Sequence, residues 1–183
     1  MTITRLSSER FYLNSSIMGE LHDLDWLKQH VDDDEEIFFS DVTDEIAILA
    51  VSGPLARDVL QPLTTTDLSN NSFPWLTGQE INIASVPCIA LRVSYVGELG
   101  WELYIKTNEA KEIYNLIVKT GKEFNLSHCG MFAMDTMRME NGYLHWGHDM
   151  SPEENQYQAG LQFAISYKTV SYTHLTLPTN REV

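Results

Sequence analysis

The segment at residues 95–104, with the sequence Y-V-G-E-L-G-W-E-L-Y, holds the side chains best suited to binding a ligand. Its glycines, Gly97 and Gly100, permit a tight turn, and strands on either side would bring Tyr95 near Glu102. A carboxylate can accept two parallel hydrogen bonds from adjacent N–H donors, while an aromatic ring packs against a flat heterocycle. The spacing alone favours the alternative in which Tyr95 is a core residue and Glu102 is solvated.

The elements on either side of this turn are expected to be strands. Residues 89–95 alternate bulky side chains with small or polar ones, as a strand with one buried face requires. We therefore predict that residues 89–95 and 102–105 form neighbouring strands joined through the turn at residues 97–100. Short apolar runs at residues 46–51 and 80–83 predict two further strands, and residues 11–13 predict the end of another.

Helices are expected between these strands. Asp23 is predicted to cap a short helix, Pro54 to begin a second and Asn108 to cap the longest. Another helix is expected over residues 133–141. Strands that pair through turns, with helices interspersed, predict an α+β fold with antiparallel or mixed strands.

The overall charge and composition exclude several classes of protein. The net charge is −14, and the 12 Lys and Arg residues are scattered, which argues against a nucleic-acid-binding protein. No apolar run approaches the roughly 20 residues needed to cross a bilayer, so no membrane association is expected. The N-terminus resembles no export signal, and Cys88 and Cys129 lie far apart, as reduced thiols of a cytoplasmic protein would.

The histidine-rich segment at residues 145–149 invites a metal-site interpretation, because H-x-x-H-D can place ligands on one side of a helix. Gly147 makes a regular helix unfavourable there, so we expect His145, His148 and Asp149 to make structural hydrogen bonds and no metal to bind. Arg138 is expected to pair with a buried carboxylate.

Taken together, the motifs resemble the aminomethyltransferase family, also known as the glycine-cleavage T-protein family. The similarity runs from Thr2 to about Lys168 and includes the tyrosine and glutamate seven residues apart at Tyr95 and Glu102. The other motifs in the same order are residues 22–27 (H-D-L-D-W-L), 51–54 (V-S-G-P), 137–143 (M-R-M-E-N-G-Y), 145–149 (H-W-G-H-D) and 158–161 (Q-A-G-L). The first and fourth of these resemble the dimethylglycine and sarcosine dehydrogenase branch most.

This resemblance implies that Tyr95 and Glu102 hold the pterin of tetrahydrofolate, which captures the one-carbon unit released when an N-methyl amine is oxidised. FAD would belong to a domain upstream of this chain, and a barrel domain would follow residues 1–168. The aspartate of the family falls immediately before Met1, so the resemblance assigns no catalytic residue here. It also implies that the folate-binding domain is incomplete and, as a fragment, inactive alone.

Several alternatives stay open at this point. A free-standing aminomethyltransferase would have an arginine where Met134 stands, and its absence leaves the contact to the folate tail unassigned. A folate-dependent demethylase would share Tyr95 and Glu102. A non-catalytic folate-binding regulatory protein would carry a K-G-C-Y-x-G-Q-E type motif, which we do not find. Residues 169–183 change character and resemble a translated sequencing adapter, so we interpret them as a non-native tail that packs poorly.

Overall fold

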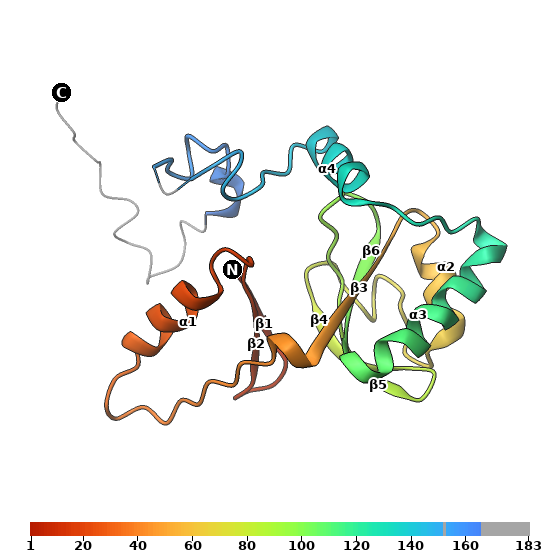
Figure 1. The fold of residues 1–183 in the computed structure, drawn as a ribbon, viewed down its shortest axis with the longest axis horizontal. Coiled ribbons are helices and arrows are strands. Elements are labelled where there is room, and N and C mark those ends of the chain that lie inside the picture. The colour runs from red at the N-terminus through yellow and green to blue at the C-terminus, as the bar shows by residue number, and fades with distance from the viewer. Residues whose placement is uncertain (152, 166–183) are drawn as a thin grey trace. The chain divides into compact units, whose positions relative to one another are not determined.

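The computed structural model describes residues 1–151 and 153–165, and the chain forms two compact units, Met1–Asn141 and Gly142–Val183. The first unit contains two antiparallel sheets with helices between the strands (Figure 1). The α+β fold with antiparallel strands predicted from the sequence is therefore confirmed. The tail predicted at residues 169–183 lies outside the described residues, and the domain boundary at residue 168 stays a prediction.

The strands of the first unit form a two-stranded and a four-stranded sheet. They are β1 (Thr2–Arg5), β2 (Phe11–Asn14), β3 (Ile46–Ser52), β4 (Gly78–Ile83), β5 (Val86–Leu91) and β6 (Gly100–Lys106). β1 pairs with β2, and the larger sheet has the order β3-β6-β5-β4 with every neighbouring pair antiparallel. The pairing predicted through the glycine turn is confirmed, since Ile89 lies opposite Tyr104 and Leu91 opposite Glu102.

The prediction that the first of these two strands continues to Tyr95 is wrong, because β5 ends at Leu91. At the next residue the backbone N–H of Arg92 donates to the Thr77 carbonyl over 2.9 Å. The guanidinium of Arg92 is buried and donates to the carbonyl of Phe73 over 2.6 Å. These bonds draw the chain away from β6, and Tyr95 consequently lies in the connection between β5 and β6.

The helices separate the strands as expected. The α-helices are α1 (Glu20–Gln29), α2 (Ala56–Leu60), α3 (Thr107–Gly121) and α4 (Met131–Glu140), and single 3₁₀ turns occur at Thr43–Glu45, Gln61–Leu63, Lys122–Phe124 and Gln162–Ala164. Within the described residues, no helix combines the length and apolar character required to cross a bilayer.

The predicted helix starts need correction. The residue that caps α1 is Gly19 and the one that caps α3 is Lys106, neither with a side-chain bond, so the caps predicted at Asp23 and Asn108 are wrong. The N–H of Asp23 already donates to the carbonyl of Gly19 over 2.7 Å, which starts α1 one turn earlier than its apolar spacing suggested. Pro54 precedes α2 instead of beginning it.

The hydrophobic core lies on one face of the four-stranded sheet, beneath α2 and α3 (Figure 1). Alternate residues of β6 supply Trp101, Leu103 and Ile105, all nearly inaccessible to solvent. α3 contributes Ile113 and Ile117, two members of the apolar stripe expected from the helical spacing. Burial of this single face fixes which side chains of β6 must point the other way.

The opposite face of the sheet contacts the β1–β2 hairpin. Asn14 donates to the Tyr104 hydroxyl over 2.6 Å, and Arg10 forms a 2.7 Å ion pair with Glu80. The hairpin also approaches Gly78 closely, since a Cβ added there would lie 2.5 Å from a methyl carbon of Thr4. The hairpin is thereby fixed against β4 and β6.

The two cysteines should differ sharply in reactivity. Cys88 is buried in the core, and burial raises the pKa of its thiol to about 11, whereas Cys129 is exposed. We expect a thiol reagent at pH 8 to label one cysteine per folded chain and both after unfolding in urea, with peptide mapping placing the first label on Cys129. Rapid labelling of Cys88 in the folded chain would contradict the packing of β5.

Candidate functional site

Glu102 lies on the sheet face opposite the hydrophobic core. It is half-buried in the middle of β6, with Ala50 of β3 on one side and Leu91 of β5 on the other. Its chain neighbours, Trp101 and Leu103, point into the core, so the alternation of the strand directs the Glu102 carboxylate to the other face. The carboxylate is therefore held by a rigid central strand, as a binding group should be.

The Glu102 carboxylate is part of a short chain of hydrogen bonds. The hydroxyl of Tyr104 donates to Oε2 of Glu102 over 2.6 Å and accepts from Nδ2 of Asn14 over 2.6 Å. Tyr12 packs edge-on against the Tyr104 ring, with the ring centroids 5.1 Å apart. Burial, followed by the bond to Glu102, raises the pKa of Tyr104 above its ordinary value, so its hydroxyl keeps its proton.

An exposed surface adjoins this carboxylate along the edge strand of the sheet. It consists of Ile48, Ala50 and Ser52 of β3, which we call the open strip. Their partners on β6 are Tyr104, Glu102 and Gly100. The open strip offers an apolar platform of Ile48 and Ala50 beside a carboxylate, which suits a flat polar heterocycle.

Tyr95 belongs to a segment that reaches one end of the open strip. The hydroxyl oxygen of its neighbour Ser94 lies 3.3 Å from that of Ser52. Ser52 is two residues along β3 from Ala50, the partner of Glu102, which is a separation of about 7 Å along a strand. The structure thus brings the half-buried Tyr95 segment and Glu102 to the same face of the sheet.

The turn that carries Tyr95 is held by the end of α4. Nδ2 of Asn141 donates to the carbonyl of Val96 and to that of Met137, each over 3.1 Å. Gly97 has a φ of +75°, and a Cβ added there would lie 2.6 Å from Nδ2 of Asn141. The glycine is therefore required for both its backbone conformation and the close approach of Asn141.

Replacing Gly97 with alanine should cost more stability than the same change at Gly142. Both have positive φ, at +75° and +69°, but a Cβ at Gly142 meets nothing within 4 Å. Gly142→Ala should therefore cost only the backbone term of about 1–2 kcal/mol, and Gly97→Ala that term plus the displacement of Asn141. Urea unfolding of both variants measures the difference, and equal losses would show that Asn141 does not hold the turn.

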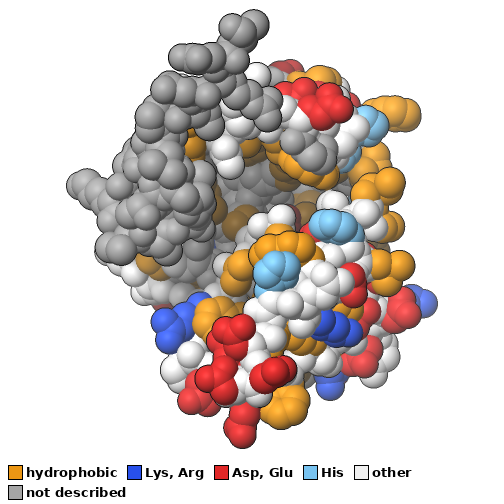
Figure 2. All heavy atoms as spheres, turned by 90° about the vertical axis from the view of Figure 1, so that its left-hand side faces the viewer, with side chains coloured by type: hydrophobic (Ala, Val, Ile, Leu, Met, Phe, Trp, Pro, Cys, Tyr) orange, Lys and Arg blue, Asp and Glu red, His pale blue; other side chains and the backbone are white. Residues whose placement is uncertain are grey.

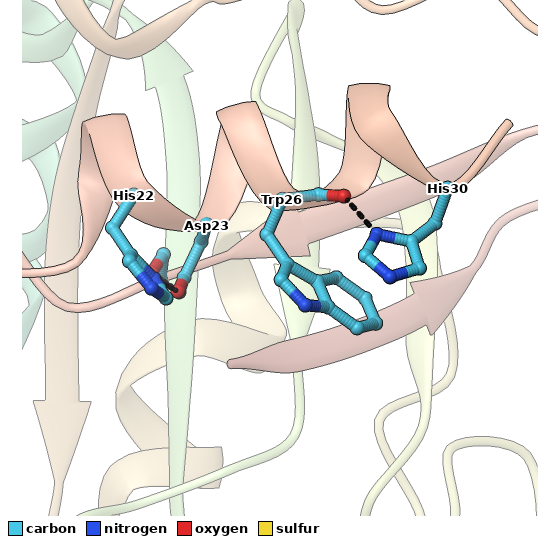
Figure 3. A network of polar contacts seen from close by, with 5 residues as sticks. His22, Asp23, Trp26 and His30 are labelled. Carbon is cyan, nitrogen blue, oxygen red and sulfur yellow. Dashed lines mark hydrogen bonds and ion pairs between the residues drawn. The ribbon is translucent and has the colours of Figure 1, made fainter.

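The motif at residues 22–27 lies on α1, whose side chains make polar contacts (Figure 3). The Ser15 hydroxyl donates to Asp23, and His22 Nδ1 lies 3.2 Å from the same carboxylate. The bond from Ser15 is the largest cause of a lowered pKa at Asp23. The ring of Trp26 stacks on that of His30, with the centroids 4.1 Å apart. Asp23 therefore ties the preceding turn to α1 without capping the helix.

The surface near α1 carries hydrophobic side chains together with acidic ones (Figure 2). Ile17, Met18 and Leu21 are all largely exposed, and none of the residues of α1 is buried. α1 and the residues just before it therefore expose apolar side chains to solvent.

The histidine segment of the second unit forms a turn. The N–H of His145 donates to the Asp149 carboxylate over 2.7 Å, and the rings of His145 and His148 meet edge-on. This agrees with the structural role predicted for Asp149. Among the residues that the structure describes, no group of three His, Cys, Asp or Glu side chains could hold a metal ion.

The ion pair predicted for Arg138 differs in one respect from the expectation. Arg138 is buried and pairs with Asp135 over 2.6 Å, but the carboxylate of Asp135 is half exposed, whereas a buried carboxylate was expected.

Two residues of the site, Tyr104 and Asn14, were not predicted from the sequence. Tyr104 carried a usable signal, since it lies two residues after Glu102 in a predicted strand and therefore on the same face. Asn14 carried none, because the bond to Tyr104 joins residues 90 positions apart in the chain.

Comparison with known proteins identifies relatives over most of the chain. Residues 1–169 match the family described as the GCVT N-terminal domain. Dimethylglycine dehydrogenase, mitochondrial, from Homo sapiens is 36% identical over 166 residues, which is 90% of this chain and 19% of that protein. The aminomethyltransferase of Thermoanaerobacter sp. (strain X514) is 34% identical over 167 residues, which is 91% of this chain and 45% of that protein.

A solved structure shares the fold. The heterotetrameric sarcosine oxidase from Corynebacterium sp. U-96 aligns with a TM-score of 0.57 and 18% identity, covering 70% of this chain and 63% of that one. The chain thus spans about a fifth of the length of dimethylglycine dehydrogenase and less than half of that of the aminomethyltransferase. The resemblance inferred from its motifs is confirmed, and the chain belongs to the GCVT N-terminal domain family.

Proposed function

We propose that this chain supplies one wall of a tetrahydrofolate site, in which Glu102 and Tyr95 hold the pterin ring. The observation that carries the proposal is the position of Glu102, a half-buried carboxylate on a central strand beside the open strip of Ile48, Ala50 and Ser52. The pterin presents adjacent N–H donors, and a carboxylate accepts such a pair in parallel. Membership in this family supports the same ligand, because the family resemblance implies a tetrahydrofolate site.

The residues present fit a pterin on chemical grounds. Only Oε2 of Glu102 receives the Tyr104 hydroxyl, so Oε1 and a second lone pair of Oε2 can serve a ligand. The negative charge of the carboxylate suits an edge of the ligand that presents only N–H hydrogen-bond donors. Bound tetrahydrofolate would supply the nucleophilic nitrogen that accepts a one-carbon unit. This chain would contribute binding, orientation of the ring and exclusion of water from that face.

The substrate proposed for the whole protein is an N-methyl amine such as dimethylglycine or sarcosine. The support is the 36% identity to dimethylglycine dehydrogenase and a similar identity to sarcosine dehydrogenase from Mus musculus. FAD, if used, would be bound outside the residues of this chain. A free-standing aminomethyltransferase is the second candidate, favoured by the match to the Thermoanaerobacter protein and disfavoured by Met134 at the expected arginine. We propose a cytoplasmic location from the sequence alone.

A titration with parts of the cofactor tests the proposal. Calorimetry of the purified chain, under anaerobic conditions, would compare tetrahydrofolate, a tetrahydropterin without the tail, and p-aminobenzoylglutamate. Because Tyr95 and Glu102 are assigned to the ring, the tetrahydropterin should retain most of the affinity and p-aminobenzoylglutamate very little. Stronger binding of p-aminobenzoylglutamate, or no saturable binding of tetrahydrofolate, would overturn the assignment.

A further inference from the structure

The chain of hydrogen bonds that ends on Glu102 has a fixed direction. An amide nitrogen can only donate, so Nδ2 of Asn14 occupies a lone pair of the Tyr104 hydroxyl. The hydroxyl has a single hydrogen, which it gives to Oε2 of Glu102. Donation therefore runs from Asn14 through Tyr104 to Glu102, and each step is 2.6 Å long.

The surroundings of Tyr104 immobilise this chain of bonds. Tyr104 is 2% exposed, although it lies outside the core cluster and on the face of the sheet that meets the hairpin. Its ring is held by Tyr12 from β2, and its partner Asn14 lies on the same strand. Ile89 of β5 lies opposite it across the sheet. A phenol so enclosed cannot change rotamer freely, so its hydroxyl points at one carboxylate oxygen.

We propose that Tyr104, supported by Asn14, is the positioning residue for Glu102, which it orients so that the remaining acceptor sites face the ligand. This inference rests on the proposed function, because the ligand edge in question is that of the pterin. Tyr104 acts only through Glu102. The carboxylate would otherwise rotate about its last bond and present its oxygens out of the plane of two adjacent donors.

The role predicts an effect for two variants that remove the same bond in different ways. Tyr104→Phe deletes the hydroxyl and keeps the ring that packs against Tyr12. Asn14→Asp replaces the donor with an acceptor, which draws the Tyr104 hydrogen away from Glu102. Each should weaken tetrahydrofolate binding roughly tenfold, and the double variant should be no weaker than either single one, since both break one chain of bonds.

A matched control separates orientation from packing. Tyr12→Phe removes a hydroxyl from the neighbouring tyrosine. It keeps the ring that packs against Tyr104 and leaves the bond from Tyr104 to Glu102 intact. Its affinity for tetrahydrofolate should equal that of the unmodified chain. A ligand-free readout is the carbon-13 resonance of the Glu102 side-chain carboxyl. It should shift in Tyr104→Phe and in Asn14→Asp, and stay in place in Tyr12→Phe.

These variants distinguish failure of the proposed function of Glu102 from failure of the positioning role of Tyr104. If Glu102→Gln binds tetrahydrofolate as well as the unmodified chain, the proposed function fails at this site. If Glu102→Gln binds weakly while Tyr104→Phe and Asn14→Asp bind normally, the positioning role alone is overturned. An unmoved carboxyl resonance in both variants overturns it as well, even where no folate binds. Weak binding, shifted resonances and non-additivity together are the result we expect.

Discussion

Replacing Trp101 with alanine is expected to lower the free energy of unfolding by about 3–5 kcal/mol. The side chain is 1% exposed and lies at the centre of the core, between the sheet and its helices. Phe73 meets it edge-on with the ring centroids 6.1 Å apart. Truncation would leave a cavity on the central strand, which a core held by rigid strands refills only in part.

Charge adds to the cost of losing Trp101. The guanidinium groups of Arg57 and Arg92 lie 5.7 Å and 5.6 Å from the centroid of its ring, and each also donates to Asn70. An aromatic face stabilises such cations, so both would lose a favourable contact at once. Trp101→Phe, which keeps a ring, should lose markedly less stability than the alanine variant.

Urea unfolding followed by circular dichroism measures these changes. The matched control is Trp75→Ala, because Trp75 is 66% exposed and its loss leaves no cavity. We expect a change of about 0.5 kcal/mol or less for that variant. Similar losses at Trp75 and Trp101 would show that the face of β6 assigned to the core is wrong, and with it the direction of Glu102.

Glu102→Gln is expected to reduce the affinity for tetrahydrofolate by about 2–4 kcal/mol. The substitution keeps the size of the side chain but replaces one acceptor with an N–H₂ donor. That donor would face either the N–H groups of the ligand or the Tyr104 hydroxyl, which already donates to Oε2. In both orientations two donors oppose each other, so the loss exceeds that of a single neutral hydrogen bond.

Stability should change little in this variant. Glu102 is half-buried and outside the core cluster, and its backbone bonds to β3 and β5 do not depend on the side chain. A large loss of both stability and affinity would indicate that Glu102 has a structural role in place of the binding role.

The sequence was sufficient for those parts of the fold in which a local pattern decides. The apolar run at residues 46–51 correctly predicted the strand β3, although β3 is an edge strand of which only Val51 is buried, and the helical stripe of Ile113 and Ile117 places α3 on the core. Pairing of β5 with β6 followed from alternation around a glycine turn. The position of Glu102 on the face away from the core then follows from the period of two.

Other features depended on contacts that no local pattern contains. The end of β5 at Leu91 is set by the bonds of Arg92 to Thr77 and Phe73, distant positions that redirect an otherwise strand-like segment. The same holds for Asn14, which reaches Tyr104 only because the β1–β2 hairpin covers the second face of the sheet. Side chains that meet across elements therefore escaped prediction.

The most direct test of the account is a calorimetric titration of tetrahydrofolate into the unmodified chain, Glu102→Gln and Glu112→Gln, side by side. Glu112 is an exposed glutamate on α3, on the opposite side of the sheet, so its variant controls for the loss of one charge. We predict that Glu112→Gln binds like the unmodified chain and that Glu102→Gln binds at least about 30-fold more weakly. Equal affinities for all three chains would contradict the assignment of Glu102 to the pterin.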